Sequence, residues 1–414
     1  RHSPLNSSPG AHRQAKTLQN TDKIKLLVCF DLVVGDTSRY ADLLLPDNSY
    51  LERFTQESIY PSQQYAVTQL GQPTTRAFEG PRPVEVTYLE LGKALGLPGV
   101  GADAFGPGNH WNTNEDYWLK MAANVAFAGA EPVPDADAEE QSIFSETRQR
   151  YLKDAYDERV WKEAVSAEEW PKVVYVLNRG GRFEGHGPDH ANGYEGDLLK
   201  YRYNGLCQFY DPKVAAAKDP MTGESFDGLA ALRDPRLANG DPIPRDGYPL
   251  HFINWKARQQ GTHRTAGSAW LREVRPSNFV SINPADARPR GIETGDTITI
   301  ASPSATVTGI ALLTEAIRPG IVGADATFGM REYGARAVEI DGETIEPPGE
   351  YGHQSSAKLV TPQHEETGYA GPRDAGFAVN DLLIDETLVG GGGMSDPIGG
   401  GAAQLDTWVE VTKS

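Results

Sequence analysis

The most constraining feature of this 414-residue sequence is the block 248–300, in which an apolar segment, a polar loop and further short apolar segments follow one another. The apolar segment 250–255 leads into a loop, 256–265, that is rich in hydrogen-bond donors. Alternating residues at 297–300 and 306–313 are typical of antiparallel strands. Because a closed β-fold places loops together on one rim, the block predicts a β-barrel that binds a large, polar, phosphorylated ligand.

A second ordered pattern lies near the start of the sequence. Residues 26–30 form a continuous apolar run of strand length, which is typical of a strand buried on both faces. A turn with a short helix at 35–40 and a second strand at 41–46 follow. This order predicts a parallel α/β unit, in which ligands bind at the carboxyl ends of the strands. Asp31 stands at such an end.

The remaining elements are predicted from composition and period. We expect a polar loop at 1–22, helices at 86–95, 115–128 and 138–165, and a buried strand at 172–177. The sequence therefore divides into an α/β domain, 1–246, and a C-terminal β-barrel domain, 247–414.

Charge excludes one large class of function. The formal net charge is −18, and nucleic-acid binding requires a basic surface. The acidic balance and the excess of 25 arginines over 14 lysines favour a halophilic archaeon as the source, with an ordinary acidic protein as the alternative. No run approaches the roughly 18 apolar residues of a membrane helix.

The cysteines and the first residues bear on chemistry and processing. Two cysteines, Cys29 and Cys207, cannot make a four-cysteine metal or iron–sulfur site. We expect Cys29 to be a buried thiol, and a disulfide with Cys207 stays open. The polar start without methionine favours a chain cut from a longer precursor, with any export signal upstream.

Three segments together resemble a known family. They are the pattern Asn-Pro-x-Asp-Ala with Gly-Ile-x-x-Gly-Asp at 283–296, the segment from Asp31 through Ala41-Asp42 and Leu45-Pro46 to Glu52-Arg53, and the segment 377–382 around Asn380. The sequence is similar to the C-terminal part of the molybdopterin (bis-guanine-dinucleotide) oxidoreductases of the dimethyl sulfoxide reductase family, and within it to the tetrathionate reductase catalytic subunits.

The resemblance implies a fold and an activity. The α/β domain would be the C-terminal half of a Rossmann-like cofactor-binding domain, followed by a double-psi-like β-barrel. The cofactor would be molybdenum bis(molybdopterin guanine dinucleotide), with a 4Fe–4S cluster in a missing N-terminal part. The whole enzyme would reduce a sulfur oxyanion such as tetrathionate, with thiosulfate, polysulfide and arsenate as alternatives.

The resemblance also implies partners and a location. Electrons would come from an iron–sulfur subunit served by a membrane anchor subunit, and the full-length protein would be exported by the twin-arginine route to the outer face of the membrane. The fragment would not be active alone. A non-catalytic nucleotide-binding module is the alternative from another class, because no catalytic residue and no metal ligand can be identified.

The resemblance assigns cofactor contacts residue by residue. A carboxylate can accept the two N–H groups of a guanine edge, cations suit a pyrophosphate, and an amide suits a pterin edge. The alternatives are a helix N-cap for the aspartate and for the helical threonine, ion pairs for the arginines, and a packed loop histidine. The expected contacts are Phe30, Asp31, Arg53, Thr87, Asn254, Lys256, Thr262, His263, Arg264, Thr265 and Asn380.

Overall fold

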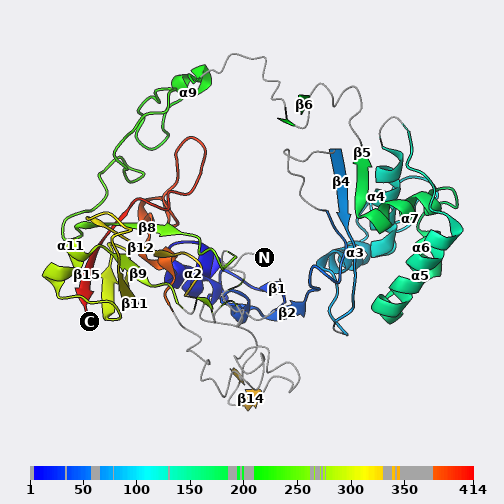
Figure 1. The fold of residues 1–414 in the computed structure, drawn as a ribbon, viewed down its shortest axis with the longest axis horizontal. Helices are drawn as coiled ribbons and strands as arrows, with labels where there is room; N and C mark the ends of the chain where they lie inside the picture. Colours follow the sequence, from blue (N-terminus) through cyan, green and yellow to red (C-terminus); the bar gives the residue numbers. More distant parts are fainter. Residues whose placement is uncertain are drawn as a thin grey trace. The chain divides into compact units, whose positions relative to one another are not determined.

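The computed structural model describes residues 4–32, 35–56, 66–77, 79–128, 131–184, 194–195, 198–199, 209–261, 265, 271, 274–275, 277–329, 338–340, 343–345 and 376–414. Contacts divide the chain into two compact units (Figure 1). We call residues 1–44 with 207–414 the barrel unit, and residues 45–206 the helical unit. The boundary predicted at 246/247 lies inside the barrel unit, because residues 207–246 are grouped with the C-terminal part, as are residues 1–44.

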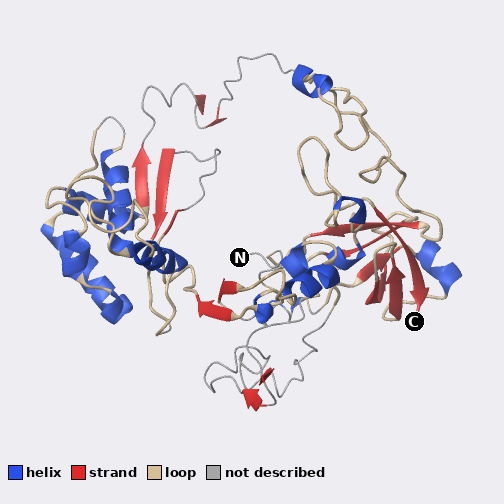
Figure 2. Ribbon diagram, turned by 180° about the vertical axis from the view of Figure 1, so that it is seen from behind, coloured by secondary structure: helices blue, strands red, loops and turns tan. Residues whose placement is uncertain are grey.

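Six strands close the predicted barrel in the order β10-β11-β9-β12-β8-β15. Its strands appear in Figure 2 as a compact red group. Strands β10 and β11 are antiparallel, with Thr297 opposite Ile310, as the alternating pattern predicts. The strands are β8 (Leu250–Trp255), β9 (Val280–Ile282), β10 (Thr297–Ala301), β11 (Thr306–Leu313), β12 (Ile321–Asp325) and β15 (Thr407–Lys413).

The barrel interior explains why these segments become strands. Alternate residues of β8, β9 and β10 are buried, so each strand places one set of apolar side chains inside. The fully buried members include Phe252, Ile282, Ile298 and Ile300. Burial of one such side chain stabilises a fold by about 1.5–3 kcal/mol. The predicted barrel is confirmed.

The first 46 residues differ from the prediction in two respects. The predicted loop 1–22 contains the helices α1 (Pro4–Ser7) and α2 (Ala11–Leu18). Helix α2 forms because most of its residues have a high helix propensity. The segment around β1 (Val28–Asp31) is not buried on both faces, since Leu26 is 65% and Val28 37% exposed.

A larger parallel sheet is not seen in the described part of the chain. Strand β1 pairs with β2 (Leu43–Pro46) in a two-stranded sheet, with η1 (Ser38–Tyr40) between them. A two-stranded sheet has no second layer of its own, which accounts for the exposure of its apolar residues. The Rossmann-like part of the fold prediction is therefore not confirmed.

In the described part of the helical unit, helices and a three-stranded sheet pack around an apolar core. The helices are α3 (Val84–Ala94), α4 (Asn114–Phe127), α5 (Ala138–Leu152), α6 (Glu158–Glu163) and α7 (Glu169–Arg179), with η2 (Lys153–Ala155) between α5 and α6. The antiparallel strands are β3 (Thr55–Gln56), β4 (Ala66–Gly71) and β5 (Gly181–Glu184). The predicted helix 138–165 is thus divided in two.

The strand predicted at 172–177 is wrong, because this segment lies within helix α7. The buried residues Trp170, Val173, Val174 and Leu177 recur at helical spacing, so one face of the helix enters the core. Tertiary burial of this stripe outweighs the strand preference of the valines.

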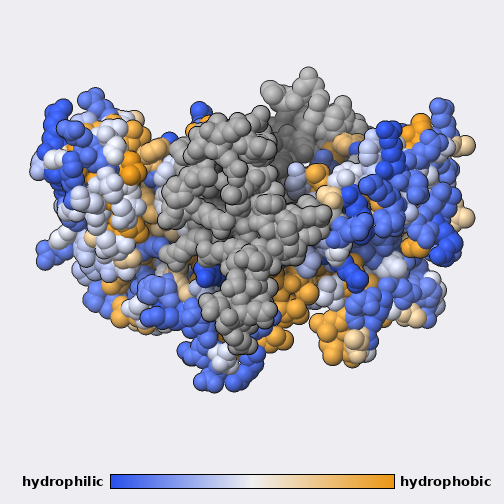
Figure 3. All heavy atoms as spheres, turned by 90° about the horizontal axis from the view of Figure 1, so that it is seen from below, coloured by the Kyte–Doolittle hydropathy of each residue, from blue (hydrophilic) through white to orange (hydrophobic). Residues whose placement is uncertain are grey.

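Shorter elements complete the described chain: β6 (Tyr194–Glu195), β7 (Leu198–Leu199), α9 (Pro212–Ala216), α11 (Pro284–Ala287), η3 (Arg288–Arg290), β13 (Val338–Ile340), β14 (Glu343–Ile345), α14 (Val379–Leu382) and η6 (Thr387–Val389). No helix within the described ranges has the length and apolar character needed to cross a membrane. On the face drawn in Figure 3, hydrophilic side chains predominate outside the grey atoms, in keeping with the net charge of −18.

Candidate functional site

The carboxyl ends of β8 and β12 lie side by side on the barrel rim. The two strands are parallel, with Trp255 opposite Asp325. The pairing continues one residue further, since the amide of Ala326 donates to the carbonyl oxygen of Trp255 at 2.8 Å. Lys256 and Thr327 therefore leave the barrel next to each other. Loops after neighbouring strand ends are where ligands of such folds bind.

Two side chains in these loops carry buried polar atoms without a protein partner. Gln260 is 2% exposed and Thr327 is fully buried. Neither the Nε2 amide of Gln260 nor the Oγ1 hydroxyl of Thr327 has a hydrogen-bond partner among the described residues. A buried unpaired polar group costs about 1–3 kcal/mol, so each requires a water or ligand group to satisfy it. The hydroxyl of Thr265 orients Gln260 by donating to its Oε1 at 2.7 Å.

Asn278 ties the end of β12 to the segment that contains Asn380. Its Nδ2 donates to the carbonyl oxygens of Asp325 at 3.0 Å and Phe377 at 2.8 Å, and its Oδ1 accepts the Phe377 amide at 2.9 Å. Asn278 is fully buried, and Asn380 is 6% exposed in α14. Asp325 pairs with Arg275 through the guanidinium Nη2 at 2.5 Å. The backbone before Asn380 is thus fixed against the barrel rim.

The residues predicted to contact the cofactor at this rim differ in their exposure and in their hydrogen bonds. The Asn254 amide donates to the carbonyl oxygen of Gln404 at 2.8 Å, so it supports the C-terminal segment. Lys256 is exposed, and Thr265 is half-buried. Thr262, His263 and Arg264 lie outside the described residues.

Asp31 lies at the end of β1, as predicted, and there it organises the turn that follows. Its Oδ2 accepts from the Ser38 hydroxyl at 2.8 Å, and its Oδ1 accepts from the Leu32 amide at 2.9 Å. Phe30 precedes it and is half-buried. Cys29 is a free, half-buried thiol; burial raises its pKa, and the charge of Asp31 adds to that increase.

Arg53 and Thr87 belong to the helical unit. Arg53 is 7% exposed and forms ion pairs at 3.2 Å with both Asp47 and Glu85. The alternative of an ion pair is therefore present, but as a buried pair. Thr87 lies inside helix α3, whose N-cap is Pro83, so the N-cap alternative is wrong. The expected meeting of all these residues with Asp31 and Asn380 in one crevice stays a prediction.

The sequence placed Gln260 within the donor-rich loop 256–265 without singling it out, and it did not indicate Asn278 or Thr327. A polar residue two positions after the end of a buried strand, as Thr327 is after β12, is a signal that could have found it. Nothing local distinguishes Asn278, whose partners lie 47 and 99 residues away. Within the described ranges, no cluster of three or more histidine, cysteine or acidic side chains could hold a metal ion.

Comparison with known proteins places these loops in a recognised domain. Residues 250–366 match the family described as Molydopterin dinucleotide binding domain. Over 437 aligned residues the chain is 32% identical to a subunit of selenate reductase from Mesobacillus selenatarsenatis, covering 100% of this chain and 39% of that protein. It is 29% identical to a subunit of tetrathionate reductase from Salmonella typhimurium, covering 82% of this chain and 33% of that protein.

The chain therefore spans about two fifths or less of the length of these curated relatives. Among solved structures, acetylene hydratase from Pelobacter acetylenicus matches 99% of this chain and 43% of its own, with a TM-score of 0.54 and 14% identity. At that identity the match concerns the fold alone.

The rim residues fit a pterin dinucleotide. Such a group needs neutral donors and acceptors for its ring system, and an unpaired amide with an unpaired hydroxyl offers both. The described residues that would hold it are Gln260, Thr327 and the α14 segment around Asn380. Once bound, the cofactor supplies the redox chemistry, and the protein supplies orientation and electrostatics.

Proposed function

Because the chain belongs to the molybdopterin oxidoreductases of the dimethyl sulfoxide reductase family, we propose that its barrel rim holds a molybdopterin guanine dinucleotide for the catalytic subunit of an oxyanion reductase. The cofactor would be molybdenum bis(molybdopterin guanine dinucleotide). Support comes from the domain match over residues 250–366 and from relatives whose names are those of reductases.

One structural observation carries the binding part of this proposal. Gln260 and Thr327 bury unpaired polar atoms in the loops that follow two adjacent strand ends. An unliganded fold would gain stability by replacing such atoms with apolar ones. Their presence is explained when a ligand completes their hydrogen bonds.

Two substrates compete within the oxyanion class. Tetrathionate is what the resemblance of the sequence motifs implies, and the 29% identical tetrathionate reductase relative supports it. Selenate is favoured by a different observation, since the selenate reductase relative is 32% identical and its match covers the whole chain. Thiosulfate, polysulfide and arsenate stay further alternatives.

We propose the following partners and location for a full-length protein that includes this chain. An iron–sulfur subunit would deliver electrons, through a 4Fe–4S cluster outside this chain, and a membrane anchor would hold the complex on the outer face after twin-arginine export. The 414-residue chain alone would neither retain molybdenum nor reduce tetrathionate with reduced viologen.

Cofactor content tests the binding site without relying on turnover. In the full-length protein, Gln260→Ala should lower the released guanine nucleotide and pterin by several-fold, because the amide loses its ligand partner. Gln149→Ala, at an exposed glutamine on α5, is the matched control and should leave both unchanged. Equal cofactor content in the two variants would argue against the rim as the site.

Substrate is decided by turnover of the full-length enzyme. Reduced methyl viologen should be oxidised with tetrathionate or selenate, and at lower rates with thiosulfate, polysulfide or arsenate. Turnover with none of these by a protein that contains pterin would reject the oxyanion class. A full-length protein without pterin or molybdenum would instead favour the non-catalytic nucleotide-binding module.

A further inference from the structure

Gln260 is a buried neutral amide in a loop whose cations are exposed. Its side chain is 2% exposed, whereas Lys256 and Arg258 are exposed to solvent. Exposed cations suit the phosphate groups of a nucleotide. A buried amide has a different requirement, because both of its polar atoms need partners away from water. The Nε2 atom of Gln260 has no such partner among the described residues.

The loop that carries Gln260 is held by its own hydrogen bonds. The backbone amide of Gln260 donates to the carbonyl oxygen of Ala257 at 3.2 Å, and that of Thr265 donates to the carbonyl oxygen of Gly261 at 3.3 Å. Ala257 is 4% exposed, so the start of the loop is anchored in the protein. A loop supported in this way holds the Gln260 side chain in one position before any ligand arrives.

The Thr265 hydroxyl decides which polar atom of Gln260 stays unpaired. Its Oγ1 accepts from the Gly261 amide at 2.7 Å, which leaves the single hydroxyl proton for another acceptor. Oε1 of Gln260 lies 2.7 Å from Oγ1, and the Gly261 carbonyl oxygen lies 3.3 Å from it. A separation of 2.7 Å is typical of O–H···O bonds, since N–H···O bonds cluster near about 2.9–3.0 Å. Oε1 is therefore the paired atom.

This arrangement fixes the polarity of the position next to Gln260. Nε2 can donate hydrogen bonds and cannot accept them. A ligand atom that completes it must be an acceptor, because a second donor would leave both groups unpaired. A neutral buried amide suits a carbonyl oxygen or an unprotonated ring nitrogen, whereas the exposed Lys256 and Arg258 suit phosphate oxygens.

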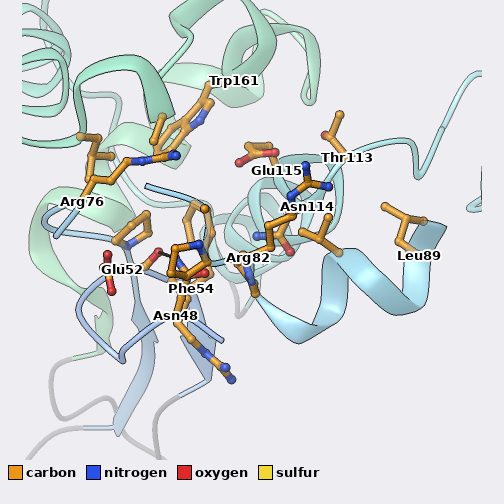
Figure 4. Close-up of a pocket in the computed structure, with 18 of the residues that line it drawn as sticks. Asn48, Glu52, Phe54, Arg76, Arg82, Leu89, Thr113, Asn114, Glu115 and Trp161 are labelled. Atoms are coloured by element: carbon orange, nitrogen blue, oxygen red, sulfur yellow. Dashed lines mark hydrogen bonds between the residues drawn. The ribbon is translucent and has the colours of Figure 1, made fainter. Parts of the chain in front are cut away.

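A cavity of about 560 Å³ in the helical unit does not define a ligand in this way (Figure 4). Its lining carries charges of both signs, which Figure 4 shows around the same space: Arg76, Arg82, Glu52 and Glu115. Polar atoms without partners also border it, such as Asn48 Oδ1 and Arg76 Nε. A space of this size admits water, which can satisfy donors and acceptors alike. The rim amide is more selective, because its unpaired atom has one polarity.

We propose that Thr265 is a positioning residue of the cofactor site, which holds Gln260 so that Nε2 donates to a neutral acceptor atom in a ring system of the cofactor. This inference rests on the proposed function and deepens it. Thr265, for which the sequence predicted direct contact with the cofactor, then acts through Gln260. Gln260 becomes a residue that selects for an acceptor on the ligand.

A double-substitution cycle in the full-length protein tests the positioning role, with released pterin and guanine nucleotide per protein as the readout. Thr265→Val removes the hydroxyl at similar volume and should lower the cofactor content several-fold, as should Gln260→Ala. The double variant should contain no less cofactor than Gln260→Ala alone, because Thr265 acts through Gln260. Thr265→Ser keeps the hydroxyl and should stay close to wild type. Thr306→Val, at an exposed threonine on β11, is the matched control and should be unchanged.

A change of polarity at constant shape tests the role of Gln260. In Gln260→Glu, an ionised carboxylate offers acceptors alone, whereas a protonated carboxyl group can donate again. Burial raises the pKa of a carboxyl group at such a position. Relative to wild type at each pH, Gln260→Glu should therefore retain more cofactor at pH 5 than at pH 8.

The outcomes separate this inference from the proposed function. Unchanged cofactor content in Thr265→Val, or a lower content in the double variant than in Gln260→Ala, would overturn the positioning role while the rim site stands. Equal or greater relative retention by Gln260→Glu at pH 8 would overturn the donor role of Nε2. Full cofactor content in Gln260→Ala would reject the rim site itself, and this inference with it.

Discussion

Asn278 shows how much one buried amide can organise. All its partners are backbone groups, from Asp325 at the end of β12 and from Phe377 before α14. Backbone groups of such loops would otherwise need water, which a fully buried position does not offer. The side chain therefore acts as a structural link between the rim and the segment with Asn380.

Replacing Asn278 tests this role. Asn278→Ala should lower the free energy of unfolding by about 3 kcal/mol, because it leaves several buried backbone groups unpaired. Urea denaturation measures the change. Asn109→Ala, at an exposed asparagine, should stay within about 0.5 kcal/mol of the wild type. Similar values for the two variants would show that Asn278 is not a link.

At the residue scale, the sequence predicted where polar side chains lie, but it did not predict which residues they bond to. Donors after β8 and an aspartate at the end of β1 were expected and are present. The partners were not expected: Asn254 bonds to Gln404, 150 residues away, and Arg53 bonds to Glu85. Partners so distant along the chain are chosen by folding, which no local pattern records.

At the scale of elements, Gly329 lets two segments of the barrel unit approach closely. It has a φ of +85°, and a Cβ atom there would overlap the backbone nitrogen of Ala378. Gly320 has almost the same conformation, with a φ of +82°, but a Cβ atom there would meet nothing within 4 Å. Comparing Gly320 with Gly329 therefore distinguishes the free-energy cost of a left-handed backbone from the cost of a steric clash.

The two alanine variants should therefore differ. Gly320→Ala should cost about 1 kcal/mol, the strain of a left-handed residue. Gly329→Ala should cost at least about 3 kcal/mol, since the backbone must also move apart. Thermal denaturation of both proteins measures the difference. Equal costs would mean that the Ala378 segment yields easily.

The strands at 297–300 and 306–313 were predicted correctly because a two-residue period is encoded locally. The error at 172–177 arose where two readings compete, since a run of valines suits a strand and its spacing also suits a helix. Only the core of the helical unit, with Trp161 and Phe144 buried, settles which one forms.

At the scale of the whole molecule, one ion pair joins the two ends of the barrel unit. Arg13 on α2 donates to Asp385 at 2.6 Å, across 372 residues of sequence. Burial alone would raise the pKa of Asp385, but hydrogen bonds from Arg13 and the Gly392 amide, with the charge of Arg13, hold it below its usual value.

This lowered pKa predicts a pH dependence. A carboxylate with a lower pKa in the folded state contributes stability above its unfolded pKa, and the contribution is lost as pH falls through the folded pKa. Asp385→Asn should thus destabilise the protein by about 1 kcal/mol at pH 7, and the difference from wild type should shrink below about pH 4.

Melting temperatures of both proteins from pH 3 to pH 7 would check this expectation, with pH values bracketing the ordinary carboxyl range of about 4. Asp22→Asn is the control, because that side chain is 99% exposed. A difference that persists unchanged at low pH would mean that Asp385 acts through packing rather than charge.

The sequence by itself determined the strand pattern of the barrel, the donor-rich loop after its first strand and the acidic surface, because each depends on neighbours or on composition. Tertiary structure alone decided which polar atoms at the rim stay without a partner among the described residues, and that Arg53 pairs with Asp47 and Glu85. The physical reason is that hydrogen bonding and ion pairing are satisfied in space, between groups whose separation along the chain carries no signal.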